Sequence, residues 1–227
     1  MSVFGSLIDQ TEVISILKDA VAASRMVDNK TQSMTNTWLF TGPPGSGRSN
    51  AAIAFAAALV CKDGGCSKCN DCMSTIIGNH ADVELIKTAG LSIKIDEVRE
   101  LITRASWAPS VANWRVVVIE DADRLTESAA NALLKVIEEP GLRTVWLLCA
   151  PSLTDVLPTI RSRCRHLSLR TPSTKAITNL LIERDAIDPK VAEFVARASG
   201  GHIGRARFLA TDLSAKQNRE NILKLPF

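Results

Sequence analysis

The stretch Gly42-Pro-Pro-Gly-Ser-Gly47-Arg48-Ser49 follows the apolar, strand-like segment Thr37–Thr41 and precedes the apolar run Ala51–Cys61. Its position between a strand and a helix separates a true phosphate loop from a chance glycine match. Backbone amides in such a loop, together with the helix N-terminus, can hold phosphate oxygens. We therefore predict nucleotide-binding residues in this loop, against the alternative of a glycine-rich turn without function; they are Gly42, Gly45, Ser46, Gly47, Arg48 and Ser49.

One position of the loop departs from the usual pattern, because Arg48 stands where a lysine is expected. A guanidinium is a planar donor fork, whereas a lysine presents a compact ammonium. Arg48 can therefore pair with phosphate, but not in the geometry of the lysine. We expect ATP or ADP to bind weakly if at all, and magnesium to bind only together with a nucleotide.

An acidic pair ends a second apolar run, Val116-Val-Val-Ile-Glu120-Asp121. In nucleotide-hydrolysing sites one such carboxylate holds magnesium and the other polarises the attacking water. The order Glu-Asp reverses the common order, so each carboxylate is displaced by about a methylene from where metal and water would need it. The alternative is that the two acids cap a helix or pair with Arg124.

Four cysteines lie just after the phosphate loop, at Cys61, Cys66, Cys69 and Cys72. Thiolates at this spacing can close a tetrahedral zinc site of structural type, with glycines and polar residues forming the turns between them. The alternative is a set of reduced surface cysteines. His80 lies nearby in sequence, but a closed site needs no fifth ligand.

Short apolar runs alternate with amphipathic segments along the first 170 residues, which predicts a three-layer α/β domain with a parallel sheet. We expect Asp96 and Thr126 to cap two of its helices. The expected strands are Thr37–Thr41, Asp82–Ile86, Arg115–Ile119, Thr144–Cys149 and Arg165–Leu169. After Leu169 three helical periods follow, at about Lys175–Arg184, Pro189–Ser199 and Ile203–Leu209.

The composition is that of an ordinary globular protein: 46% of the 227 residues are hydrophobic, 22% are charged and the net charge is +3. No apolar run is long enough for a membrane span, and the N-terminus has no signal-like pattern, so we expect a cytoplasmic protein without a membrane partner. The cysteine pattern suggests no disulfide framework. A charge of +3 does not by itself indicate nucleic-acid binding.

Two further motifs accompany these features: Asn131-Ala-Leu-Leu-Lys135-Val-Ile-Glu138-Glu139-Pro140 and Ser162-Arg163-Cys164. Together with the phosphate loop and the four-cysteine insert, they resemble bacterial clamp-loader subunits of the AAA+ class, from about Phe4 to Leu209. The resemblance implies an AAA+ nucleotide-binding-like domain over 1–170 with a zinc insert at 61–72. It also implies a helical lid and the start of a C-terminal collar over 171–227. Because the chain stops before such a collar, we expect a fragment or an unusually short member.

The resemblance further implies a hetero-oligomer with gamma/tau and delta subunits, which acts on a sliding clamp and primed DNA within a DNA-directed DNA polymerase holoenzyme. In such assemblies the Ser-Arg-Cys arginine, here Arg163, reaches the ATP of a neighbouring subunit as an arginine finger. A solvated loop arginine is the alternative.

The same family includes ATPase subunits, and the chain departs from them at several points. Besides Arg48 and the reversed acids, no hydroxyl follows Cys149 until Ser152, and Gly204 fills the slot of a sensing arginine. Arg205 comes one residue later, which rotates its side chain by about 100° on a helix. We expect a largely non-hydrolysing subunit. The alternatives are an active gamma-type ATPase and, ranked last, a zinc-dependent nucleic-acid-binding module.

Overall fold

A five-stranded sheet forms the centre of the molecule in the computed structural model, which describes residues 2–26, 34–88 and 90–212. Its strand order is β2-β3-β4-β1-β5, and every neighbouring pair is parallel. The strands are β1 (Thr37–Thr41), β2 (Val83–Ile86), β3 (Arg115–Ile119), β4 (Thr144–Ala150) and β5 (Arg165–Ser168). The predicted parallel sheet is confirmed, with strand ends that shift by one residue at most.

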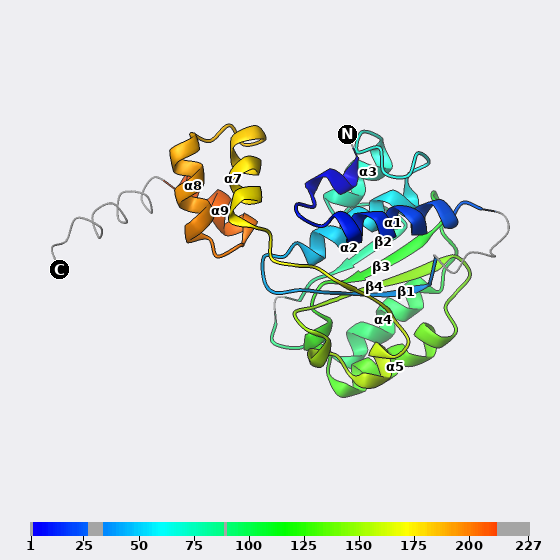
Figure 1. Cartoon of the computed structure of the whole chain (residues 1–227). Coiled ribbons are helices and arrows are strands. Elements are labelled where there is room, and N and C mark those ends of the chain that lie inside the picture. Colours follow the sequence, from blue (N-terminus) through cyan, green and yellow to red (C-terminus); the bar gives the residue numbers. More distant parts are fainter. Residues whose placement is uncertain (1, 27–33, 89, 213–227) are drawn as a thin grey trace.

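Helices cover both faces of this sheet (Figure 1). The 3₁₀ helix η1 (Val3–Ser6), α1 (Thr11–Ala23) and α2 (Arg48–Val60) pack on one face, and α4 (Ile95–Ala105) and α5 (Glu127–Glu138) pack on the other. Alternate residues of β3 serve the two layers, because successive strand side chains point to opposite faces. The three-layer α/β prediction is confirmed. Shorter segments are α3 (Asn70–Ile76), η2 (Ala122–Arg124), η3 (Leu153–Asp155) and α6 (Pro158–Arg161).

Of the two predicted helix caps, one is confirmed and one is wrong. The Thr126 hydroxyl accepts a hydrogen bond from the Ala129 amide at 3.3 Å and begins α5 as expected. The prediction for Asp96 is wrong, because Lys94 is the N-cap of α4 and Asp96 lies within its first turn. Glu97 compensates by accepting the Lys94 amide at 3.1 Å.

Three helices form a C-terminal helical unit beyond one end of the sheet (Figure 1): α7 (Thr174–Glu183), α8 (Pro189–Ala198) and α9 (Ile203–Thr211). They bury a small core of their own. Residues near the N-terminus connect this unit to the rest of the chain: the Asp9 carboxylate accepts the Ser173 amide at 2.9 Å, and Arg184 donates to the Gly5 carbonyl. The expected start of a collar, over 213–227, lies outside the described residues.

Asp82, which directly precedes β2, fixes the loop that leads into β3. Its carboxylate is fully buried and accepts the amides of Ser110, Val111 and Ala112 at 2.7–2.8 Å, with Arg115 at 3.7 Å. Burial opposes ionisation, but these backbone donors outweigh it and lower the pKa of Asp82 to about 2. Folding therefore favours the ionised form of Asp82.

We expect Asp82→Asn to destabilise the fold by about 3 kcal/mol at pH 7, because the amide nitrogen cannot accept the loop N–H groups. The folded pKa lies below the ordinary value, so the carboxylate contributes fully above about pH 4 and its contribution is lost as the pH falls toward 2. The difference in unfolding free energy between Asp82→Asn and the unaltered chain, measured by urea unfolding, should be smaller at pH 2.5 than at pH 7. Asp96→Asn, at a side chain 82% exposed, is the control. Equal midpoints for Asp82→Asn and the unaltered chain at pH 7 would contradict the prediction.

Candidate nucleotide, metal and interface sites

The pieces of the predicted nucleotide site meet at one edge of the sheet. The phosphate loop follows β1, the acidic pair follows β3, and β4 lies between these two strands. All three strands are parallel, so their carboxyl ends share one edge, where open α/β sheets bind ligands. The Gly42 amide donates to the Pro151 carbonyl at 3.2 Å and ties the start of the loop to the end of β4.

The loop has the backbone of an anion-binding site. Gly45 and Gly47 both have φ of 88°, in the left-handed region that favours glycine. The Ser46 hydroxyl is buried inside the loop without a hydrogen-bond partner. Within the described ranges, the amides of Gly45, Gly47, Arg48 and Ser49 donate to no other group. Four N–H groups are thus available to phosphate oxygens at the N-terminus of α2.

Arg48 is turned back onto its own loop. One terminal nitrogen of its guanidinium donates to the Gly42 carbonyl at 2.8 Å, and its Nε is buried without a partner. To bind a phosphate with that terminal nitrogen, Arg48 would have to release this carbonyl. The contact gives a structural reason to expect weak nucleotide binding.

The acidic pair lies near Arg48 but has other contacts. Glu120, whose side chain is 13% exposed, has Lys87 at 3.8 Å, and Asp121 begins η2. Arg124, the partner in the alternative interpretation, donates instead to the Gly90 carbonyl at 3.0 Å. Burial raises the pKa of the Cys149 thiol, with the Arg48 charge opposing and the two carboxylates reinforcing the effect. The loop arginine and both acids therefore lie within electrostatic range of the end of β4.

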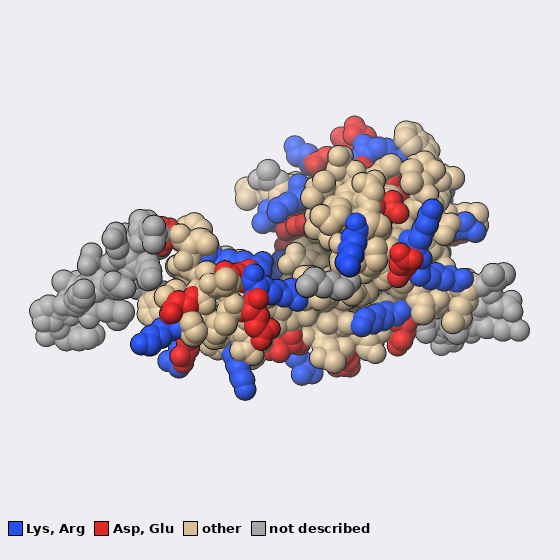
Figure 2. Space-filling model, turned by 90° about the horizontal axis from the view of Figure 1, so that it is seen from above, with Lys and Arg blue, Asp and Glu red and all other residues tan. Residues whose placement is uncertain are grey.

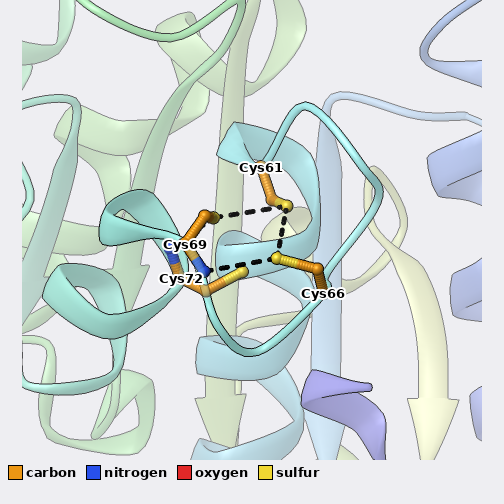
Figure 3. A group of neighbouring side chains, drawn as sticks. All are labelled: Cys61, Cys66, Cys69 and Cys72. Atoms are coloured by element: carbon orange, nitrogen blue, oxygen red, sulfur yellow. Dashed lines mark hydrogen bonds between the residues drawn. The ribbon is translucent and has the colours of Figure 1, made fainter. Parts of the chain in front are cut away.

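The four cysteines converge as Figure 3 shows, and their sulfur atoms all lie within 4.8 Å of one another. The Cys61 sulfur is 3.8 Å from that of Cys66 and 3.6 Å from that of Cys69. A tetrahedral zinc with Zn–S of about 2.3 Å needs sulfurs about 3.8 Å apart, so the donor set fits such an ion. Backbone amides point at the sulfurs, including that of Cys72 to Cys69 at 3.4 Å.

The cluster is anchored to the core on two sides. Cys61 and Cys72 are buried, and Arg25, just after α1, donates to the Cys61 carbonyl. Burial opposes ionisation of Cys61, but backbone donors outweigh it and lower its pKa to about 6, which suits a thiolate ligand. His80 is used elsewhere: its Nδ1 accepts the Asp82 amide at 3.0 Å. A fifth ligand is not required.

Arg163 lies on the surface after α6, with 39% of its side chain exposed. Its Nε and one terminal nitrogen both contact the Glu138 carboxylate at 2.5 Å, and the other terminal nitrogen donates to the Thr159 carbonyl at 2.9 Å. The Glu138 side chain is 48% exposed, and such exposed pairs contribute only about 0.2–1 kcal/mol. Arg163 is therefore pre-ordered at the surface by a partner that it can release at low cost.

Two residues near these sites were not predicted from the sequence. Glu138 belongs to a quoted motif but had no role, and it is now the partner of Arg163. His202, to which no sequence motif assigns a role, caps α9 and lies against Gly45 of the phosphate loop. No local sequence pattern indicates either contact, because each joins residues from different elements. The feature of the sequence that comes closest is Gly204, which leaves space for the His202 ring.

Acidic and basic side chains are interspersed over the face seen in Figure 2. A nucleic-acid-binding module would favour a stripe of one sign or exposed stacking aromatics. This face therefore gives no support to the interpretation of the chain as a zinc-dependent nucleic-acid-binding module. Of the helices in the described part of the chain, none combines the length and the apolar character needed to cross a membrane.

Comparison with protein families matches residues 17–173 to the model described as DNA polymerase III, delta subunit. The delta prime subunit of Bacillus subtilis DNA polymerase III is 31% identical over 219 residues, which cover 95% of this chain and 64% of that protein. The delta prime subunit of Pseudomonas aeruginosa is 33% identical over 173 residues, covering 73% and 53%. A gamma/tau subunit of Mycobacterium tuberculosis is 30% identical over 208 residues, covering 87% and 35%. The chain thus spans less than two thirds of the length of these relatives.

Solved structures with a similar fold include the Holliday-junction branch-migration motor RuvB of Thermotoga maritima, at 18% identity and a TM-score of 0.64. That match covers 96% of this chain and 64% of the other. A gamma-subunit-related protein of DNA polymerase III from the same organism has 20% identity and a TM-score of 0.56, with coverage of 96% and 64%. These matches establish a P-loop fold of the AAA+ type.

Proposed function

We propose, because the chain belongs to the DNA polymerase III delta-subunit family, that it serves as the delta prime subunit of a bacterial clamp loader. In this role it assembles with gamma/tau and delta subunits in a hetero-oligomer that loads a sliding clamp onto primed DNA in the cytoplasm. It is thereby a component of the polymerase holoenzyme. The contacts with clamp and DNA are indirect in this proposal.

The observation that carries the proposal is the contrast between two arginines. Arg48, with its Nε buried, is bonded to a carbonyl of its own phosphate loop, whereas Arg163 is exposed and held by a surface ion pair with Glu138 and by a hydrogen bond to the exposed Thr159 turn. An arginine supplied to another subunit's nucleotide needs exposure and a weak resting contact, and Arg163 has both. We infer that Arg163 acts in trans as an arginine finger while the chain's own site hydrolyses little or no ATP.

The remaining parts follow from this assignment. The C-terminal helical unit serves as the lid of an AAA+ module over 171–212, and the preceding residues form its nucleotide-binding-like domain. Cys61, Cys66, Cys69 and Cys72 hold a structural zinc ion. ATP or ADP binds weakly through the loop amides, with magnesium only when nucleotide is present. Zinc bound there would order the insert and supply no catalytic chemistry.

A gamma-type ATPase is the second candidate, because the loop amides are available and gamma/tau subunits are among the relatives. It requires Arg48 to leave the Gly42 carbonyl and replace the usual lysine.

We expect the isolated chain to show negligible ATP turnover, because the loop lysine is absent, the acids are reversed and Arg48 is occupied by its own loop. The measurement is steady-state phosphate release at saturating ATP and magnesium. Gly47→Val, which forces a branched side chain into the left-handed region, is the matched loop variant. Steady hydrolysis by the unaltered chain that Gly47→Val abolishes would select the gamma-type alternative.

A further inference from the structure

Arg25 connects the end of α1 to the turn that follows Cys61. Its guanidinium donates to the Cys61 carbonyl, which also accepts the Gly64 amide at 3.2 Å. Gly64 has φ of 73°, in the left-handed region, and a β-carbon built on it would lie 3.3–3.4 Å from three atoms of the guanidinium. Glycine at this position therefore allows the guanidinium to lie against the turn between Cys61 and Cys66.

The cysteine cluster lies at the end of a helix that disfavours negative charge. Cys61 is the C-cap of α2, and α2 has no basic residue in its last turn. A helix C-terminus carries a negative partial charge, and four thiolates around a divalent zinc ion leave a further net negative charge. A cation at this point stabilises such a site, and it must come from outside α2.

Arg25 supplies a cation at this position. In the described part of the chain, no lysine and no other arginine donates to a residue of the cluster. Lys62 and Lys68, within the insert, are exposed. The sulfur atoms themselves accept neutral backbone amides at 3.3–3.4 Å. These amides orient the sulfurs, whereas Arg25 holds the backbone that carries Cys61.

We propose that Arg25 is a positioning residue of the metal site. It holds the Cys61 turn in the conformation that binds the ion, and its charge offsets the negative charge that the thiolates bring to the end of α2. This inference rests on the proposed zinc site and is independent of the role in trans of Arg163. Partners that support metal ligands from outside are typically worth about 10- to 100-fold in metal affinity. Because Arg25 is exposed, water screens its charge, and we expect the lower end of this range.

The test is titration of the reduced, metal-free chain with Co²⁺, followed by displacement of the Co²⁺ with Zn²⁺. Absorption from sulfur-to-cobalt charge transfer reports the bound ion. Arg25→Met keeps an apolar side chain of similar length but removes the charge and the donors, and it should weaken binding of both ions by about tenfold. Arg25→Lys keeps a charge and a donor, and it should recover most of the affinity. Lys62→Met removes an exposed charge of the same insert, and it should bind both ions like the unaltered chain.

Hydrogen exchange of the zinc-loaded proteins tests the positioning role directly. Residues 62–65 should exchange faster in Arg25→Met than in the unaltered chain, because their turn has lost its contact with the end of α1. Exchange in the sheet should not change. Thermal unfolding of the metal-free proteins should give equal midpoints for Arg25→Met and the unaltered chain, which would show that the loss of affinity does not come from a damaged fold.

Several results would overturn the proposal. If Arg25→Met binds both ions as tightly as the unaltered chain, Arg25 is only a surface residue. If Lys62→Met loses as much affinity, the effect is one of overall charge and not of the contact with Cys61. If Arg25→Lys binds as weakly as Arg25→Met, the charge has no role. An unaltered chain that binds neither Co²⁺ nor Zn²⁺ would refute the zinc site together with this inference, whereas the three results above would leave the zinc site standing.

Discussion

Replacing Cys66 with serine should remove zinc from the folded chain and loosen the segment around residues 61–77. The unaltered chain should contain one equivalent of zinc, because its four sulfurs already lie within 4.8 Å of one another. In zinc-finger peptides the metal contributes on the order of 10 kcal/mol to folding. Most of the buried core surrounds the sheet and lies outside the insert, so we expect a smaller loss that is concentrated in the insert and in α3.

The measurement is elemental analysis of protein purified without chelator, together with hydrogen exchange over the insert. Cys164→Ser is the matched control, because Cys164 lies outside the cluster and burial raises its pKa to about 12. It should retain the metal. If Cys66→Ser fails to fold, chelation of the unaltered chain followed by hydrogen exchange tests the same point. Unaltered protein that contains no metal would show that the cysteines are merely reduced thiols.

Arg163→Ala should lower DNA-stimulated ATP hydrolysis by an assembled clamp loader while it leaves the fold of this chain intact. The fold is spared because the pair with Glu138 is exposed, and exposed pairs contribute about 1 kcal/mol at most. We expect catalysis to be affected because, in the proposed role, the guanidinium stabilises transition-state charge at the neighbour's nucleotide. Arginine fingers in related phosphoryl-transfer systems are worth about 10³ or more in rate.

The total rate will fall by less than this factor if the ATP sites act independently. Only the site that faces this chain loses its finger, so the loss is then limited to the share of that site. If hydrolysis at that site gates the cycle, clamp loading slows as well. Single-turnover hydrolysis together with a loading assay distinguishes the two cases.

Two matched variants separate a role in trans from a local one. Glu138→Gln removes the resting ion pair but keeps the arginine, so it should hydrolyse and load like the unaltered assembly. Arg163→Lys keeps the charge but loses the planar fork, so it should remain defective. If Arg163→Ala matches the unaltered assembly in both assays, Arg163 is only a solvated loop residue. If Glu138→Gln has the same defect as Arg163→Ala, the ion pair itself is what matters.

The sheet and the parts of the nucleotide site could be predicted because their signals are local. Five apolar runs separated by helical periods define the parallel strands, and loops after parallel strands must share one edge. The Asp96 cap could not be predicted this way. Ile93 forms a bridge with Leu125 and keeps the chain extended up to Lys94, so α4 begins two residues earlier than the best capping side chain suggests.

Contacts between elements that are distant in the sequence could not be predicted from local sequence patterns. Glu138 and Arg163 belong to α5 and to the turn after α6, and nothing in either motif specifies that they pair. His202 meets Gly45 only because the helical unit folds back against the loop. Arg48 was identified as a departure from the sequence alone, but its bond to the Gly42 carbonyl depends on the loop's own conformation.

The central claim is that this chain completes a neighbour's ATP site and does not hydrolyse ATP at its own. The most direct measurement compares ATP hydrolysis by this chain alone, by a gamma/tau-type ATPase subunit with a delta subunit and primed DNA, and by all of these components together. We predict no turnover by this chain alone, and stimulation in the mixture that is lost with Arg163→Ala. Turnover by this chain alone, or a mixture no faster than the ATPase subunit with delta and DNA, would contradict the claim.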